Sequence, residues 1–67
     1  MKKNDKLEIS ELAIEQGVAK NWRNIICYSK PNEYGVIVIE RDGIQNPEAR
    51  VKCRIHKDFF RKKPRGK

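Results

Sequence analysis

The sequence predicts a small α+β domain in which two short helices precede a β-hairpin and a short final helix. Three observations lead to this prediction: an amphipathic run that ends at Gly17, a second amphipathic run from Ala19 to Ser29, and two strand-like runs after Lys30. The chain has 67 residues, which allows one domain with a small core. We expect residues 1–6 to be disordered, 7–62 to form the domain and 63–67 to be a basic tail.

The charge is positive and unevenly distributed. Sixteen Lys and Arg against nine Asp and Glu give a formal net charge of +7. Nine of the basic residues lie between Arg50 and Lys67, where Asp58 is the single acid, whereas Asp5–Glu15 is acidic. This asymmetry predicts one electropositive side, which attracts an anionic polymer such as DNA or RNA.

The first helix is expected at about residues 10–16. Ile9, Leu12 and Ala13 share one helical face, and the acids of this segment share another. Ser10 can cap the N-terminus, and Gly17 stands where a C-cap needs a left-handed residue.

The second helix is expected within Ala19–Ser29, and we interpret it as a DNA-recognition helix. At helical spacing, one face is apolar and the other carries Lys20, Arg23, Asn24 and Cys27. Arg, Lys and Asn suit phosphate oxygens and base edges. The apolar run is short, however, and Ile25, Ile26 and Tyr28 also have strand propensity, so residues 24–29 are either helix or strand.

A β-hairpin follows the break at residues 30–35. Val36–Ile39 is β-branched throughout, and Arg50–Ile55 alternates, with Val51, Cys53 and Ile55 on one side and Arg50, Lys52 and Arg54 on the other. The loop between the two strands is rich in turn residues. The expected outer face is basic and includes Arg41 at the start of the tip.

The C-terminal segment is expected to form a short helix that contains Phe59 and Phe60. At least one of these rings should pack in the core against Trp22, Ile25 or Val38. Pro64 ends this helix, and the basic tail can neutralise phosphates without reading sequence.

These elements resemble the small winged-helix domains of the excisionase and MerR type. In the run LEISELAIEQGVAKNWRNII the residues Ile9, Ala13, Gly17, Val18 and Ile26 match that pattern, and RVKCRIHKDFF is similar to its closing strand and helix. The sequence departs from the pattern at Ala19, where a Ser or Thr cap is usual, and at Trp22, which stands about one residue early. The resemblance implies a protein that bends DNA near recombination sites, as several copies side by side, so that an integrase excises a mobile element.

Enzymatic and metal sites are not indicated. Cys27, Cys53 and His56 could supply three zinc ligands, but a fourth ligand and a paired-Cys knuckle are missing. No catalytic triad, glycine-rich phosphate loop or metalloprotease motif is present. We therefore expect no cofactor and no small-molecule substrate. The longest apolar run is too short to span a bilayer and the first ten residues lack a signal peptide's apolar stretch, so we expect a cytoplasmic, nucleoid-associated protein.

The leading hypothesis is a winged-helix protein that binds double-stranded DNA, either as an excisionase or as a transcriptional regulator. The expected DNA-binding residues lie on the second helix, the wing and the C-terminal segment: Lys20, Asn21, Arg23, Asn24, Arg41, Arg50, Lys52, Arg54, Arg61, Lys62, Lys63 and Arg65. The alternative fold is an N-terminal helix with a three-stranded antiparallel meander formed by NIICYS, VIVIE and RVKCRI. That fold would suit an RNA-binding module or a phage inhibitor of a host protein.

Overall fold

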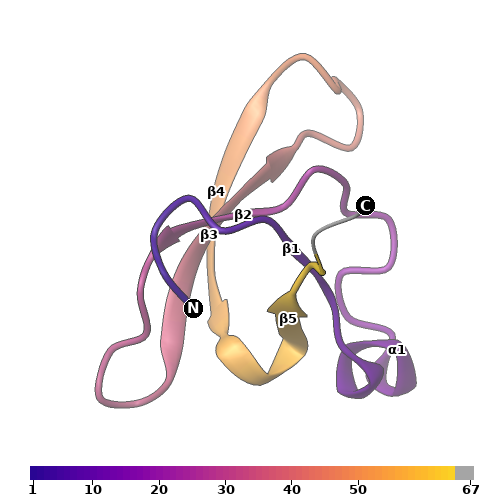
Figure 1. The fold of residues 1–67 in the computed structure, drawn as a ribbon. Coiled ribbons are helices and arrows are strands. Elements are labelled where there is room, and N and C mark those ends of the chain that lie inside the picture. Colours follow the sequence, from indigo (N-terminus) through magenta and orange to yellow (C-terminus); the bar gives the residue numbers. More distant parts are fainter. Residues whose placement is uncertain (65–67) are drawn as a thin grey trace.

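The structure is a computed structural model that describes residues 1–64, and it confirms an α+β fold (Figure 1). The elements in chain order are β1 (Leu7–Ile9), α1 (Glu11–Gln16), β2 (Ile26–Ser29), β3 (Val36–Asp42), β4 (Arg50–His56), the 3-10 turn η1 (Lys57–Phe59) and β5 (Phe60–Lys62). The strands form an antiparallel three-stranded sheet, β2–β3–β4, and an antiparallel pair, β1–β5. Within the described residues, no helix has the length and apolar character needed to cross a membrane.

The two sheets enclose one small core. Ile37 and Ile39 of β3 and Cys27 of β2 are fully buried, and Leu7 of β1 and Phe60 of β5 pack against them from the second sheet. A bridge between Lys6 and Ile26 links the sheets where β1 approaches β2. The core therefore forces one face of β2–β3–β4 inward and leaves the other face to solvent.

The N-terminal helix is confirmed with its two caps. The hydroxyl of Ser10 accepts a hydrogen bond from the backbone N–H of Ala13, and Gly17 ends the helix in the left-handed region at φ 69°. The helix is only six residues long, so it depends on packing rather than on its own propensity. Ala13 is its buried residue.

The prediction of a second helix is wrong. Residues 26–29 form strand β2, and residues 17–25 form an irregular connection with turns. Two residues in this connection, Ala19 and Asn24, have positive φ angles of 58° and 53°, which no α-helix accommodates. Ile25 and Cys27 are buried, while Tyr28 is exposed. The burial thus follows the period of two that pairing with β3 imposes.

The hairpin expected at the centre of the chain is confirmed as β3 and β4. Seven residue pairs join these strands, from Val36 with His56 to Asp42 with Arg50. The expected alternation along β4 also holds, since Arg50, Lys52 and Arg54 are exposed. Together with β2, the hairpin forms the three-stranded meander that the sequence allowed as the alternative fold.

The prediction of a C-terminal helix is also wrong, and a winged-helix fold is not confirmed. The segment instead forms η1 and then β5, which pairs with β1 so that Phe60 lies opposite Ile9. Phe60 is buried and stacks on Trp22 with ring centroids 6.1 Å apart, which confirms the expected aromatic contact. The extended backbone at Phe60 places its ring in the core, and Phe59 packs partly buried against the same core, whereas a helix here would break the pairing with β1.

Residues 4 and 5, near the N-terminus, form backbone hydrogen bonds with Cys27 of β2. The N–H of Asn4 donates to the carbonyl of Cys27, and the N–H of Cys27 donates to the carbonyl of Asp5. These bonds extend the line of β1 along β2. They place Lys2 and Lys3 beside the outer, solvent-facing side of the three-stranded sheet.

Candidate nucleic-acid interface

Tyr28 stands at the centre of a basic, solvent-facing surface on the β2–β3–β4 sheet. The residue is 42% exposed, and the Nζ atoms of Lys52 and Lys3 lie 4.1 and 5.6 Å from the centroid of its ring. We call this surface the outer face and define it by Lys3, Lys6, Tyr28, Lys52 and Arg54. It combines one aromatic ring with four cations, of which Lys52 and Lys3 lie beside the ring.

A β-bulge contributes to the position of Tyr28. Cys27 pairs with Ile39 and Ser29 pairs with Val38, so the strand carries one extra residue, Tyr28, relative to β3. Such a bulge redirects a side chain locally. Cys27 remains in the core, where burial raises the pKa of its thiol.

The strand register determines which basic residues share this face. Residues paired across antiparallel strands point to the same side of a sheet. Ile26 pairs with Glu40 and Glu40 with Lys52, while Val38 pairs with Arg54. Lys6 pairs with Ile26 in the bridge that joins the sheets, so it extends the same face.

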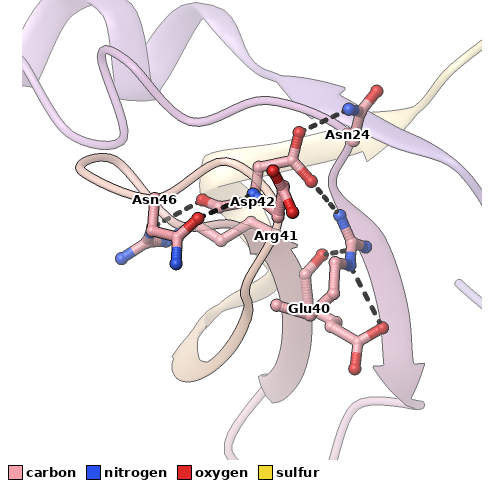
Figure 2. Close-up of polar contacts among 7 residues, drawn as sticks. Asn24, Glu40, Arg41, Asp42 and Asn46 are labelled. Carbon is pink, nitrogen blue, oxygen red and sulfur yellow. Dashed lines mark hydrogen bonds and ion pairs between the residues drawn. The ribbon is translucent and has the colours of Figure 1, made fainter.

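Arg50 lies on the same strand face but has internal partners in Glu40 and Asp42, which Figure 2 labels together with Asn24. Its Nη1 donates to Asp42 Oδ1 at 2.6 Å, and its Nε lies 3.5 Å from Glu40 Oε1. Asn24 Nδ2 donates to the other carboxylate oxygen of Asp42 at 2.6 Å. The hydrogen bonds from Arg50 and Asn24 hold the pKa of Asp42 below its usual value. Arg50 and Asn24, both expected to contact DNA, therefore join the end of the meander to the segment before β2.

Arg41 lies on the opposite side of the sheet from the position that the sequence predicts for it. The sequence placed it on the outer face, but it pairs with Val51 and shares the inner side with Ile39. Its guanidinium carbon lies 4.4 Å from the centroid of the Trp22 ring. A guanidinium is weakly hydrated and stacks well on aromatic rings, which favours this contact, whereas the buried Nε atom of Arg41 has no hydrogen-bond partner within residues 1–64.

The other expected residues are spread over several surfaces. Lys20, Asn21 and Arg23 are exposed in the connection before β2, and Lys62 and Lys63 are exposed at the end of the described chain. Arg61 forms an ion pair with Glu8 on the neighbouring strand. Arg65 lies outside the described residues. The structure thus keeps Lys52 and Arg54 together and separates them from the positions expected on a recognition helix.

Two residues of the outer face, Tyr28 and Lys3, were missed by the sequence reasoning. Tyr28 was assigned no role in binding, and Lys3 was assigned to a disordered terminus. A strand interpretation of NIICYS would have found the first, since period two puts Tyr28 on the side opposite Cys27. No sequence signal indicated the second, because it depends on pairing between residues 4–6 and β2.

The three residues weighed as zinc ligands do not come together as a site. Cys27 and Cys53 occupy the two strands that flank β3, and both pair with Ile39 between them. His56 lies at the end of β4, where its Nδ1 accepts a hydrogen bond from the N–H of Asp58. Across residues 1–64, no group of three or more His, Cys, Asp or Glu side chains is arranged to hold a metal ion.

Comparison with known proteins returns no relative. No protein-family model matches the sequence, no curated protein is similar to it, and no solved structure matches its fold. The resemblance to excisionase-type domains therefore has the sequence pattern as its sole support, and the functional argument depends on the geometry of the outer face.

Proposed function

We propose that this protein binds single-stranded nucleic acid on the outer face of its β2–β3–β4 sheet. The observation that carries the proposal is the exposed Tyr28 ring with Lys52 and Lys3 beside it. Proteins that bind single strands combine a basic surface, which follows the phosphates, with aromatic rings on which bases stack. A sheet with exposed aromatic residues is one of the common platforms for RNA.

The energies favour a base over the lysines at the Tyr28 ring. The two exposed cation–π contacts contribute about 0.5–1 kcal/mol each, whereas stacking of a base on an aromatic side chain contributes about 1–3 kcal/mol and leaves both ammonium groups free to bind phosphates. Lys52 and Lys3 are exposed and have long flexible stems. A base can therefore displace an ammonium group from the ring, and the ammonium group can then bind a neighbouring phosphate.

The remaining cations of the face suit the backbone of the strand. Among residues 1–64, neither Lys52 nor Arg54 takes part in an ion pair, whereas the acidic Glu40 and Asp42 on the same side are bound by Arg50. The acids nearest the face are thus partly neutralised. The face keeps a positive field at the point where Tyr28 offers its ring.

Binding of double-stranded DNA, as an excisionase or a regulator, is the second candidate. The sequence suggested a helix that enters the major groove, and residues 19–29 contain no helix. A two-stranded β-ribbon, however, also fits the major groove. The β3–β4 hairpin projects from the body of the protein, away from α1 (Figure 1). Two cations expected on the wing, Lys52 and Arg54, are exposed on this hairpin.

The test is a fluorescence-anisotropy titration with a labelled 12-nucleotide single-stranded RNA, the same DNA strand, and the DNA duplex. We expect tighter binding to a single strand than to the duplex. Tyr28→Ala should weaken single-strand binding about 5- to 150-fold, the equivalent of a lost stack of about 1–3 kcal/mol. Tyr28→Phe should retain most of the affinity because it keeps the ring.

Tyr34→Ala is the matched control, since Tyr34 is 74% exposed and lies in the turn between β2 and β3 rather than beside Lys52. It should leave the affinity within about twofold. Unchanged affinity in Tyr28→Ala would refute the stacking role. Tighter binding of the duplex than of either single strand would favour the second candidate instead.

A further inference from the structure

A cleft lies beside the outer face, between β1 and the segment that precedes β2. It consists of two adjoining hollows that share Leu7, Asn24, Ile25 and Lys63 as lining residues. One hollow extends to Lys6 and Ile26, and the other extends to Trp22 and Arg23. Leu7 and Ile25 are buried core residues, and they form the floor of the cleft.

Three cations from three separate segments surround this cleft: Lys6, Arg23 and Lys63. The backbone N–H of Lys63 donates to the carbonyl of Lys6, which fixes the two chain segments side by side. Within residues 1–64, none of the three cations forms an ion pair. The acid that lines the cleft, Glu8, is paired with Arg61.

The polar group at the middle of the cleft is also held in place. Asn24 has a left-handed backbone at φ 53°, and its side-chain amide donates to Asp42. The backbone N–H of Asp42 donates in turn to the carbonyl of Arg23. These two bonds fix the backbone at residues 23 and 24 against the end of β3, so the cleft is a preformed feature.

The cleft is continuous with the outer face. Lys6 and Ile26 line the cleft and also pair with each other in the bridge between the sheets, and Ile26 shares a face with Lys52 through Glu40. From Tyr28 to Asn24 the chain covers about 13 Å at about 3.3 Å per residue, the length of about four stacked nucleotides. A strand stacked on Tyr28 can therefore reach the cleft without a turn in its path.

We infer that the cleft binds the phosphodiester backbone of the same nucleic acid strand that stacks on Tyr28. This inference rests on the proposed single-strand binding. In this arrangement Lys6, Arg23 and Lys63 contact the phosphates. The full site then extends from Tyr28 to the cleft at Asn24, a length of about four stacked nucleotides.

The test is the dependence of affinity on strand length, measured by following protein amide shifts in NMR titrations with oligothymidylates of 4, 8 and 12 nucleotides. The wild-type protein should bind the 8-mer at least tenfold more tightly than the 4-mer. Replacement of both cleft cations, Arg23→Gln with Lys63→Gln, should remove most of that gain. The same variant should bind the 4-mer within about twofold of wild type.

Lys57→Gln is the control variant, because Lys57 is an exposed cation on η1 whose N–H bonds to Gly35 near the far end of the hairpin. It should preserve the gain with length. A double cleft variant that binds the 8-mer as tightly as wild type would overturn the inference, as would equal losses for the 4-mer and the 8-mer. Failure of the wild-type protein to bind any oligonucleotide would overturn the proposed function itself, and with it this site.

Discussion

The number of cations in the proposed site predicts how strongly the binding affinity depends on salt concentration. The outer face and the cleft together present six cations that have no ion pair within residues 1–64: Lys3, Lys6, Arg23, Lys52, Arg54 and Lys63. If each neutralises one phosphate, a single strand that fills the site gives a slope of log affinity against log salt of about −4, at about −0.7 per contact. Affinity then falls about 300-fold between 50 and 200 mM salt.

The perturbation is the double variant Lys52→Gln with Arg54→Gln. It removes two contacts, so the slope should become about −2.8 and the same change of salt should cost about 50-fold in affinity. Tyr28→Ala should behave differently. A stacked ring releases no counterions, so this variant should bind more weakly at every salt concentration and keep the wild-type slope.

The assay is an anisotropy titration of a 12-nucleotide single strand at four salt concentrations, with circular dichroism as the check that each variant is folded. A wild-type slope near zero would refute the phosphate contacts. An unchanged slope in the double variant would place the contacts elsewhere on the protein. A reduced slope in Tyr28→Ala would refute the division between ring and cations.

Three further outcomes concern stability. Ile39→Ala should lower the free energy of unfolding in urea by about 2–5 kcal/mol, because the side chain is fully buried at the centre of the sheet; a change below about 1 kcal/mol would contradict that packing. Gly35→Ala should lower the melting temperature more than Gly17→Ala does: both glycines have positive φ, but a Cβ at Gly35 would lie 2.7 Å from an imidazole nitrogen and one at Gly17 would meet nothing within 4 Å. Equal effects would show that the imidazole moves aside. The lowered pKa of Asp42 stabilises the fold above its unfolded value of about 3.8, and this contribution is lost as the pH falls through the folded pKa. In urea unfolding between pH 7 and pH 3, Asp42→Asn should therefore be less stable than wild type at neutral pH and less sensitive to acid, whereas identical pH profiles would contradict the network around this carboxylate.

The sequence predicted those elements whose signals are local. The first helix has a hydroxyl cap at Ser10 and a glycine at its end, and both act within one turn of chain. The hairpin has β-branched residues in β3 and strict alternation in β4. These signals do not depend on the rest of the fold, and the structure confirms both elements.

The segment from Ala19 to Ser29 was misread because its helical pattern and its strand pattern share the same apolar residues. Ile25 and Ile26 fit one face of a helix, but in the structure Ile25 precedes β2 and is buried, whereas Ile26 is the first residue of β2 and is only partly buried. The tertiary pairing with β3 decides between the two patterns. Positive φ angles at Ala19 and Asn24 end any helix before β2. Neither residue type predicts a positive φ angle as strongly as a glycine does.

The candidate site was partly predictable for the same reason. Lys52 and Arg54 follow from alternation within one strand, so the sequence placed them on a basic surface. Their association with Tyr28 and Lys3 requires the register of β2 and the pairing of residues 4–6 with it. Arg41 shows the converse error, since alternation along β3 turns it inward onto Trp22 although its charge suggested an exposed role.

The most direct test of the central claim is a ¹⁵N–¹H NMR titration of the folded protein with a single-stranded 12-mer. We expect the largest backbone shifts at residues 27–29 of β2 and 51–54 of β4, with further shifts at residues 3–6, 23–25 and 63. Residues 11–16 of α1 should remain nearly unchanged. Shifts concentrated on α1 and the segment of residues 17–21, with β2 and β4 unperturbed, would contradict binding on the outer face of the sheet.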